Sequence, residues 1–528
     1  MFLGAEVQRG EHGSYCTLPD QYGKELQKLC SSLKSAESEI RERLLRLENF
    51  WLRCRTQLEF LKRVEPMMDE SHRELVEQTL RMFLSKLETV TALLKRLLKP
   101  RNASDGPVVD AETVPKRIKY AFKKESLDEA IDALEIWQRV SDPSWFLLLR
   151  IADRQLDSEL SSNGSETAST IPSTLMIRSG LQEVGQDTNS TSGISLPPEA
   201  LKKMRISGIQ FCDAQAAEVA GSTRAAMYIL SRINCPPLVK YHNTKKDIRD
   251  LARKLQHDEP HTFGLLNCKG FITKLLNDGD NTRAAFTMVF RIPLGLSSPR
   301  SLRDLLLNAP TPSSLSQRFE MAQELAKAVS YVHTFGFVHK NIRPESILSF
   351  GSPNTPTRSV FLVGFENFRR EEGNTQRRGD DVPERNLYRH PTRQGPTPQD
   401  DYLMQHDIYS LGVCLLEVGL WQSFFQYDVE NGSTVASALL GIPPDSTTKH
   451  VAYYLSTTGK SHLLSLTRSE LRQCMGTKYA EVVETCLTCL DPDNTDFGDQ
   501  RQFEDEDGIR VGVRYIEKVL YRLNMLYV

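Results

Sequence analysis

Residues 339–348, His-Lys-Asn-Ile-Arg-Pro-Glu-Ser-Ile-Leu, carry the polar side chains with the clearest chemical pattern in the chain. An amide at Asn341, a guanidinium at Arg343 and a hydroxyl at Ser346 lie close together along this segment. A neutral amide cannot act as a general base, a role that is typically worth ~10²–10⁴-fold in rate. Asn341 therefore cannot take a proton from a substrate hydroxyl.

Four segments of the chain, in this order, resemble the signature segments of eukaryotic protein kinases. The first is residues 339–348, which in kinases read His-Arg-Asp-Leu-Lys-Pro-x-Asn-Ile-Leu. Residues 362–366 stand in place of the Asp-Phe-Gly segment, residues 388–391 resemble the Ala-Pro-Glu end of an activation segment, and residues 407–412 resemble the start of a large helix. The resemblance covers residues 200–528, is clearest over 301–421, and implies an α+β bilobal kinase-like fold.

The resemblance also assigns a role to each position of these segments. In kinases the loop Asp accepts the substrate proton, the Asn five residues later binds a metal ion, and the Asp of Asp-Phe-Gly holds magnesium. Asn341, Ser346 and Gly364 occupy those three positions. Arg343 replaces a Lys, keeping the charge but not the compact ammonium geometry. Because no carboxylate clamps magnesium, the resemblance implies no standard phosphoryl transfer, no catalytic residue, no metal and no required cofactor.

The positions that hold the kinase lobe together are retained, in contrast to the chemical positions. They are His339, Phe365, Pro391, Asp407 and Gly412. Thr392 replaces the Glu of Ala-Pro-Glu, so the usual ion pair beneath the activation segment lacks its carboxylate. One alternative is that Glu366, two positions beyond Gly364, or Glu345 takes over metal or base duties. The competing interpretation of Glu366 is an exposed loop glutamate.

The nucleotide site that the resemblance implies is degenerate. No Gly-x-Gly-x-x-Gly loop precedes the candidate third strand, and the nearest material, residues 220–224, has a single glycine. Such a loop exists to bring the backbone close to phosphates. The third-strand lysine is assigned to Lys240, with an exposed edge-strand lysine as the alternative. The partner helix, residues 245–256, contains Asp247 and Asp250 but no Glu. ATP binding without catalysis stays an open alternative.

The N-terminal part has the apolar periodicity of long amphipathic helices. One helix is predicted from Leu26 to near Pro66, with a shift of phase near Ile40, a second ends before Pro100, and a third covers about 115–140. Residues 1–157 are therefore predicted to form an all-α helical bundle. Stretches 47–61, 116–137 and 142–146 resemble the HeLo and HeLo-like (prion-inhibition and propagation) regions of fungal incompatibility proteins.

The middle of the chain changes in composition. Residues 158–198 are rich in Ser, Thr, Gly and Asn and cannot bury enough apolar surface to offset chain entropy, so a flexible linker is predicted. Beyond it, strands are predicted at 265–272, 284–292 and 360–363, and helices at 315–334 and 408–421. The kinase-like domain is placed at 199–528, with a small lobe at 199–293 and a large lobe at 294–528.

The overall composition limits the partners. Lys+Arg 66 against Asp+Glu 68 gives a net charge of −2, without the basic excess of a nucleic-acid-binding protein. Basic residues gather between Lys95 and Lys124, either as a solvated helix face or as a surface for anionic membranes. Ten scattered cysteines, including Cys486 and Cys489, are interpreted as free thiols, the last two buried. With no spanning segment or signal peptide, we expect an intracellular, cytoplasmic protein, with membrane association as an alternative.

These observations leave three hypotheses for the function. The favoured one is a catalytically inactive kinase-like signalling protein whose pseudokinase domain binds protein partners or controls the helical bundle, as in fungal incompatibility or cell-death signalling. The bundle would then be an effector or self-association module. The second is an active Ser/Thr kinase of atypical mechanism that uses Glu366 or Glu345. The third is a membrane-active cell-death effector that acts through the bundle.

Overall fold

The computed structural model describes most of the chain in two compact units, which span residues 1–171 and 172–528. The described residues are 17–32, 38–64, 70–98, 126–131, 133–134, 194–202, 204–219, 227–234, 241–256, 260–278, 281–309, 312–352, 355–370, 379–427, 434–443, 445–497, 515–524 and 526. The described part of the first unit is helical, and the second combines helices with sheets. This agrees with the predicted multidomain architecture.

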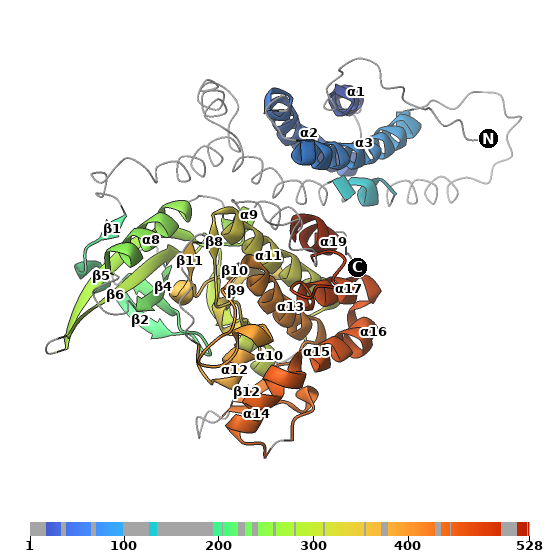
Figure 1. Ribbon diagram of the computed structural model, residues 1–528. Coiled ribbons are helices and arrows are strands. Elements are labelled where there is room, and N and C mark those ends of the chain that lie inside the picture. The colour runs from blue at the N-terminus through green and yellow to red at the C-terminus, as the bar shows by residue number, and fades with distance from the viewer. Residues whose placement is uncertain are drawn as a thin grey trace, which may run out of the picture. The chain divides into compact units, whose positions relative to one another are not determined.

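The first unit contains helices α1 (Thr17–Ser32), α2 (Ser38–Val64) and α3 (Glu70–Leu98), and residues 126–131 and 133–134 are also helical (Figure 1). The single helix predicted from Leu26 to near Pro66 is therefore wrong, because it is two helices. The phase shift near Ile40 marks the change, since one continuous helix would have turned its apolar stripe away from the core. The second predicted helix corresponds to α3.

The core of the helical unit comes from the apolar stripes of its helices. Leu26, Trp51, Phe83 and Leu134 are all buried, so α1, α2, α3 and the 126–134 segment each bury part of their apolar face. Arg43 of α2 donates two hydrogen bonds of 2.6 Å to the Asp128 carboxylate. Bidentate geometry is the strongest form of such a pair, so it fixes the 126–134 segment against α2.

Within the parts of the chain that the structure describes, no helix combines the length and the apolar character needed to cross a membrane.

The small lobe of the second unit is a six-stranded sheet in the order β1-β5-β6-β4-β3-β2 (Figure 1). Its strands are β1 (Ser195–Leu196), β2 (Met204–Gly208), β3 (Gln215–Val219), β4 (Met227–Asn234), β5 (Asn267–Asp278) and β6 (Asn281–Arg291). Apart from the parallel pair β1–β5, neighbouring strands are antiparallel. Helix α8 (Tyr241–Lys254) contacts β5, and the short helices α7 (Glu199–Lys202) and α9 (Pro260–Phe263) precede β2 and β5 along the chain.

Strand β1 lies inside the segment for which the sequence predicts a flexible linker, so that prediction is wrong for its last residues. The amide of Phe271 donates to the carbonyl of Ile194 at 2.9 Å. Gly270 permits this approach: its φ is +143°, and a Cβ there would lie 2.2 Å from the Ile194 carbonyl oxygen. The sheet therefore gains an edge strand from the segment that precedes the kinase-like domain.

The large lobe is mainly helical. Its helices are α10 (Leu302–Asn308), α11 (Leu315–Thr334), α12 (Pro383–Asn386), α13 (Met404–Leu420), α14 (Thr448–Tyr454), α15 (Lys460–Leu466), α16 (Arg472–Met475), α17 (Thr477–Leu487) and α19 (Tyr521–Asn524). Its strands are β7 (Ser297–Ser301), β8 (Phe337–Val338), β9 (Ile347–Ser352), β10 (Thr355–Leu362), β11 (Arg369–Arg370), β12 (Phe425–Tyr427) and β13 (Thr434–Ala436). Helices α11, α13 and α17 pack together at its centre (Figure 1).

Local sequence explains the central helices. Helix α11 begins where predicted, because Ser314 and Gln317 form a reciprocal capping box. Helix α13 is buried on almost all sides, as its continuous apolar sequence predicts. Gly412 on α13 lets α17 approach closely, since a Cβ there would lie 2.8 Å from the Cβ of Cys486. Cys486 and Cys489 are free and buried, in agreement with the sequence interpretation.

Candidate functional site

The loop at residues 339–348 is held on the large lobe by Asp407 of α13. Its carboxylate accepts hydrogen bonds from the backbone amides of His339 and Lys340, at 2.7 and 2.9 Å, and from the hydroxyl of Tyr402 at 2.7 Å. Burial alone would raise the pKa of Asp407, but its bonds to His333 and Tyr402 lower it. Asp407 is therefore an ionised anchor that fixes the loop on the large lobe.

His339 joins the loop to the segment at 363–366. Its Nε2 lies 3.0 Å from the carbonyl oxygen of Val363, and its ring packs on Phe365 with centroids 4.7 Å apart. The side chain is fully buried, and burial lowers the pKa of His339 to about 4. This neutral imidazole has a structural role, in agreement with its assignment as a retained scaffold position.

Asn341, at the position of the kinase base, is bonded through its whole side chain. Its Nδ2 donates to the carbonyl of Gly364 at 3.1 Å and to Oε2 of Glu366 at 2.7 Å, while its Oδ1 accepts from Nε of Arg343 at 2.9 Å. Both amide hydrogens are thus committed to acceptors. The side chain connects the two segments and has no means of taking a proton from a substrate hydroxyl.

The two positions assigned to metal ligands face each other closely. The Ser346 hydroxyl donates to the carbonyl of Asn341 at 2.6 Å and accepts from the amide of Arg343 at 3.1 Å, so its hydrogen bonds stabilise the backbone of the loop itself. Gly364 has a φ of +84°, and a Cβ at this position would lie 2.7 Å from the Cβ of Ser346. Among the described residues, no three Asp, Glu, His or Cys side chains are placed to hold a metal ion.

The two glutamates considered as substitutes for the missing carboxylates lie in different surroundings. Glu345 is buried and paired with Arg303 at 3.0 Å and Arg343 at 3.5 Å. Burial would raise the pKa of Glu345, but these two guanidinium groups lower it. Glu366 instead lines a cavity, and burial, with a contribution from Asp213, raises its pKa. The structure thus brings Glu366 to the site, and it is not the exposed loop residue of the competing interpretation.

Glu345 belongs to a buried charge network below the site. Arg303 of α10 is completely buried and donates to Glu345, to Glu417 of α13 at 2.8 Å and to Ser423 at 2.6 Å. The Tyr388 hydroxyl also donates to Glu417, at 2.6 Å. Glu345 is therefore part of a network that joins α10, the loop and α13.

Thr392 stands at the position of the activation-segment glutamate. Its hydroxyl bonds to Nδ1 of His390, at 3.0 Å. Lys460 lies beside His390 and pairs with Asp491. The segment is therefore fixed by a neutral hydrogen bond at this point, as the loss of the carboxylate predicts.

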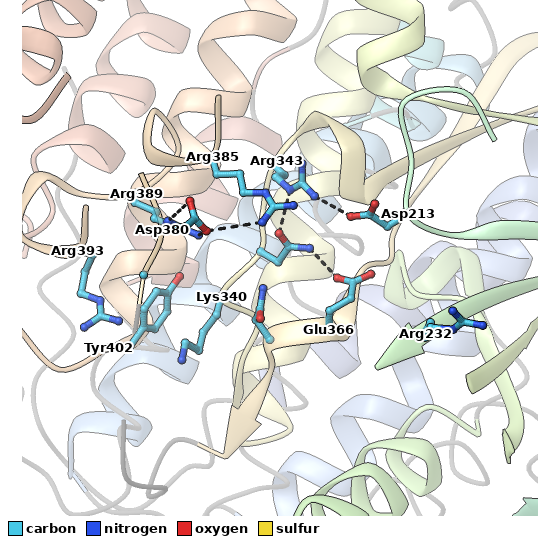
Figure 2. A pocket seen from close by; sticks show the side chains of 13 residues that line it. Asp213, Arg232, Lys340, Arg343, Glu366, Asp380, Arg385, Arg389, Arg393 and Tyr402 are labelled. Atoms are coloured by element: carbon cyan, nitrogen blue, oxygen red, sulfur yellow. Dashed lines mark hydrogen bonds and ion pairs between the residues drawn. The ribbon is translucent and has the colours of Figure 1, made fainter. Parts of the chain in front are cut away.

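The cavity beside the loop has a volume of about 580 Å³ (Figure 2). Cationic, carboxylate and neutral side chains line it: Arg232, Lys340, Arg343, Arg385, Arg389, Arg393, Asp213, Glu366, Asp380, Asn341, Asn367, Gly379 and Tyr402. Asp380 pairs with Arg389 at 3.0 Å and with Arg385 at 3.6 Å. Cationic side chains outnumber carboxylates around the cavity, so it favours an anionic ligand.

Lys340 shows the effect of this crowding. Burial, reinforced by Arg369 and Arg393, lowers the pKa of Lys340 to about 8. Its ammonium lies 5.4 Å from the centre of the Tyr402 ring. The backbone at Lys340 has a φ of +64°, a conformation that is uncommon for a residue with a side chain and that marks a locally constrained loop.

The strand cation at the cavity is Arg232 of β4, which sequence reasoning missed. Lys240, assigned to that role, lies outside the described residues. Tyr241, which follows Lys240, is not in a strand, because it begins helix α8. The cationic side chain that a strand of the small lobe brings to the cavity is instead Arg232 of β4. The sequence has no apolar–polar alternation at this point, although in the structure Arg232 is exposed between the buried Ser231 and Ile233.

Sequence reasoning also missed Asp213 and the arginines of residues 385–393. Asp213 lies in the turn between β2 and β3, and its carboxylate is 3.0 Å from Arg343. This turn, residues 209–214, occupies the place that the kinase resemblance predicts for residues 220–224. The arginines recur every four residues, at 385, 389 and 393, and that spacing was the signal that would have found them.

Part of the chain is similar in sequence to a known protein. No protein-family model matches the chain. A 172-residue stretch is 28% identical to eukaryotic translation initiation factor 2-alpha kinase 1 of Rattus norvegicus and covers 29% of this chain. The match covers 26% of that protein, so the chain spans about a quarter of its length. Together with the fold, this similarity indicates a protein-kinase-like region.

Proposed function

We propose that residues 199–528 form a pseudokinase, a kinase-like module that does not transfer phosphate by the magnesium-dependent mechanism and instead binds a regulatory partner. The observation that carries this proposal is the state of Asn341. It stands at the position of the base with both amide hydrogens donated, to Gly364 and Glu366. A group in that state can order a loop but cannot accept a proton.

The two positions that would clamp magnesium support the same proposal. Ser346 is turned toward its own loop, and Gly364 offers no side chain. Glu366 supplies a carboxylate beside Asn341. One carboxylate does not replace the pair of metal ligands that kinases use to neutralise the transferring phosphoryl group.

The direct test is incorporation of the γ-phosphate of ATP by the purified full chain. Autophosphorylation and transfer to a general acceptor protein are measured with magnesium and with manganese, for the wild type and for Glu366→Gln. We expect both chains to match the no-enzyme background. Incorporation by the wild type above that background would overturn the proposal, and its loss in Glu366→Gln would assign the activity to the Glu366 carboxylate.

A second candidate, an active kinase of unusual mechanism, is favoured by one observation. Glu366 lines the cavity with a pKa raised by burial, and Asn341 orients its carboxylate at 2.7 Å. A raised pKa suits a general base that works near neutral pH. The Glu366→Gln comparison above decides between the two candidates.

The proposal includes no required cofactor, and any ATP binding would be without catalysis. The cations Arg232 and Arg343 favour phosphate groups, whereas Asp213 and Glu366 oppose them. The melting temperature of the full chain with and without ATP, in magnesium and in EDTA, shows whether attraction or repulsion of the phosphate groups is larger. A ligand at 100 times its Kd stabilises by ~2.7 kcal/mol. A shift that is equal in both buffers identifies ATP as a structural ligand, and a shift only with magnesium favours the second candidate.

We further propose that the pseudokinase controls the helical unit of residues 1–157, with protein partners and self-association of the helices as the output, in fungal incompatibility or cell-death signalling. The resemblance of the helical stretches supports this role. Light scattering of the full chain over a range of concentrations measures self-association. Release of dye from anionic vesicles by the full chain would instead favour action on membranes, to which the basic residues between Lys95 and Lys124 in the sequence would contribute.

A further inference from the structure

The turn between β2 and β3, residues 209–214, reaches across from the small lobe and contacts the large lobe. The ring of Phe211 packs on the ring of Tyr427, with centroids 5.1 Å apart. The Ser301 hydroxyl donates to the carbonyl of Gln210 at 2.7 Å. Two elements of the large lobe, β12 and the start of α10, therefore hold this turn down over the cavity.

The third contact is ionic and lies at the site itself. Oδ2 of Asp213 is 3.0 Å from a terminal nitrogen of Arg343 (Figure 2). The other arms of this guanidinium are occupied as well, since Nε donates to Asn341 and the second terminal nitrogen lies 3.5 Å from Glu345. Arg343 is thus surrounded by three acceptors of the protein's own.

These three acceptors differ in how easily they can leave. The Glu345 side chain is 9% exposed and is held by Arg303 as well as by Arg343, whereas the Asp213 side chain is 64% exposed. Asn341 is fixed by its bonds to the neighbouring segment. An anion that approaches Arg343 from the cavity therefore competes with Asp213 and leaves the other two in place.

The backbone of the turn indicates that its closed position depends on these contacts. Phe211 has a φ of +52°, in the left-handed region that a residue with a bulky side chain rarely adopts. Such a conformation persists only where the surroundings determine it. Release of Asp213 from Arg343 would remove one of the contacts that keep Phe211 in this conformation.

We propose that residues 209–214 are a gate. Asp213 occupies the anion position at Arg343, and a ligand that carries a phosphate group displaces it and opens the turn. This proposal rests on the proposed binding role of the kinase-like region and names how access to that site is regulated. The cationic lining of the cavity attracts the ligand. The ligand opens the turn only if its phosphate group binds Arg343 more strongly than the Asp213 carboxylate does.

Cys212, next to the gating residue, reports on the gate in the full chain. It is partly buried, and burial raises the pKa of its thiol to about 12, so alkylation is slow while the turn is closed. Its rate with iodoacetamide is measured by peptide mapping relative to the exposed Cys474. The variants are Asp213→Asn and, as a matched control, Glu218→Gln, which removes an exposed carboxylate from the adjoining strand.

We expect Asp213→Asn to raise the relative rate at Cys212 by about two- to five-fold, the range for an ion pair with one exposed partner. Glu218→Gln should leave it unchanged. A second variant, Arg343→Gln, should open the gate from the other side and give a similar rise. The Asp213 charge raises the pKa of the Cys212 thiol and the Arg343 charge lowers it, so only opening of the turn raises the rate in both variants. Equal rates in the wild type and both gate variants, or a rise in Asp213→Asn alone, would overturn the proposal.

The ligand is tested with inorganic pyrophosphate in EDTA, by calorimetric titration of the same chains. We expect pyrophosphate to bind Asp213→Asn about two- to five-fold more tightly than the wild type, and not to bind Arg343→Gln. Equal affinity for the wild type and Asp213→Asn, or no binding to either, would overturn the competition. Phosphate transfer by the wild type would refute the inactive function while leaving the Cys212 result intact, so the two failures are distinguishable.

Discussion

The amide nitrogen of Asn341 donates to Oε2 of Glu366 across 2.7 Å, so the two motifs that would do chemistry in a kinase are bonded to each other. The donor is an amide where kinases have a carboxylate, and the acceptor is a carboxylate two positions from where kinases have one. The pair stabilises the loop because a neutral amide N–H donates to a carboxylate oxygen. Two carboxylates at this distance would repel each other.

This relationship predicts the effect of Asn341→Asp. The substitution restores the kinase residue but places a second carboxylate beside Glu366, which raises the pKa of the pair above that of an unfolded carboxyl. A raised folded pKa gives stability that is present at low pH and lost as pH rises. We therefore expect the variant to lose ~1–3 kcal/mol at pH 8 and less at pH 5, without phosphate transfer. Urea unfolding at both pH values measures this.

The control for that substitution is Asn367→Asp, which adds the same charge at an exposed neighbouring position. We expect it to change the free energy of unfolding by less than about 0.5 kcal/mol at either pH. If the two variants lose the same stability with the same pH dependence, the bond between Asn341 and Glu366 has no special contribution.

The second prediction concerns Gly364→Ala. An alanine would adopt φ near +84° at a cost of ~1–2 kcal/mol. Its Cβ would also meet the Cβ of Ser346 at 2.7 Å, and such overpacking adds ~1–3 kcal/mol. Gly395→Ala is the matched control, because Gly395 has a φ of +77° and a Cβ added there would have no atom within 4 Å. Denaturant titration should show a larger loss for Gly364→Ala, and equal losses would contradict the steric argument.

The third prediction tests the buried charge network. Arg303→Met should cost ~3–5 kcal/mol, because it leaves the Glu417 carboxylate buried without its cation and Glu345 with Arg343 alone. The surface pair of Arg468 with Glu484 provides the comparison. Arg468→Met should cost at most ~1 kcal/mol. Thermal and urea unfolding of both variants would refute the importance of the network if the two losses were similar.

The fourth prediction concerns acid. Burial lowers the pKa of His339 and His390 to about 4 and that of His406 to about 3. The unfolded chain therefore binds these protons first, at its ordinary pKa near 6.5, so stability is complete above this pH and falls toward pH 4. Each group should contribute on the order of 1 kcal/mol per pH unit in that window. Urea midpoints from pH 7 to pH 5 measure the slope.

Substitution of one histidine tests whether that residue contributes to the pH dependence of stability. His406→Asn should reduce it by the share of one group, because the amide oxygen can still accept from the Leu403 amide that now bonds to Nδ1 of His406 at 2.9 Å. His450→Asn, at an exposed position, should leave the slope unchanged. A slope that His406→Asn does not alter would exclude this histidine as a source of acid sensitivity.

Much of the large lobe could be predicted from the sequence because its signals are local. The capping residues Ser314 and Gln317 and the apolar period gave α11 its observed bounds. The four kinase-like segments predict the kinase positions at which Asn341 and Gly364 stand, those of the base and of a magnesium ligand. The apolar periodicity of a helix and a short sequence motif both depend on residues close together in the chain, so both can be recognised in the sequence.

The small lobe was harder because long-range pairing decides it. Strand β4 carries Ser231 and Arg232 at its middle, and its place is fixed by pairing with β6, where Ile229 lies opposite Phe290. The apolar residues near 240 have a more strand-like sequence, although Tyr241 begins a helix. Asp213 and Arg343 are separated by 130 residues, and no local pattern indicates that they meet.

Strand β1 has a mechanical consequence. The chain that arrives from the N-terminal unit enters the sheet through a two-residue strand that runs parallel to β5, with the Phe271 amide bonded to Ile194. A pulling force along that chain would load this bond first and shear it from the sheet edge, while the long β5–β6 hairpin stayed paired. Strand β1 has two residues whereas β5 has twelve, so a force on residue 194 would detach β1 at a lower load than it would separate β5 from β6.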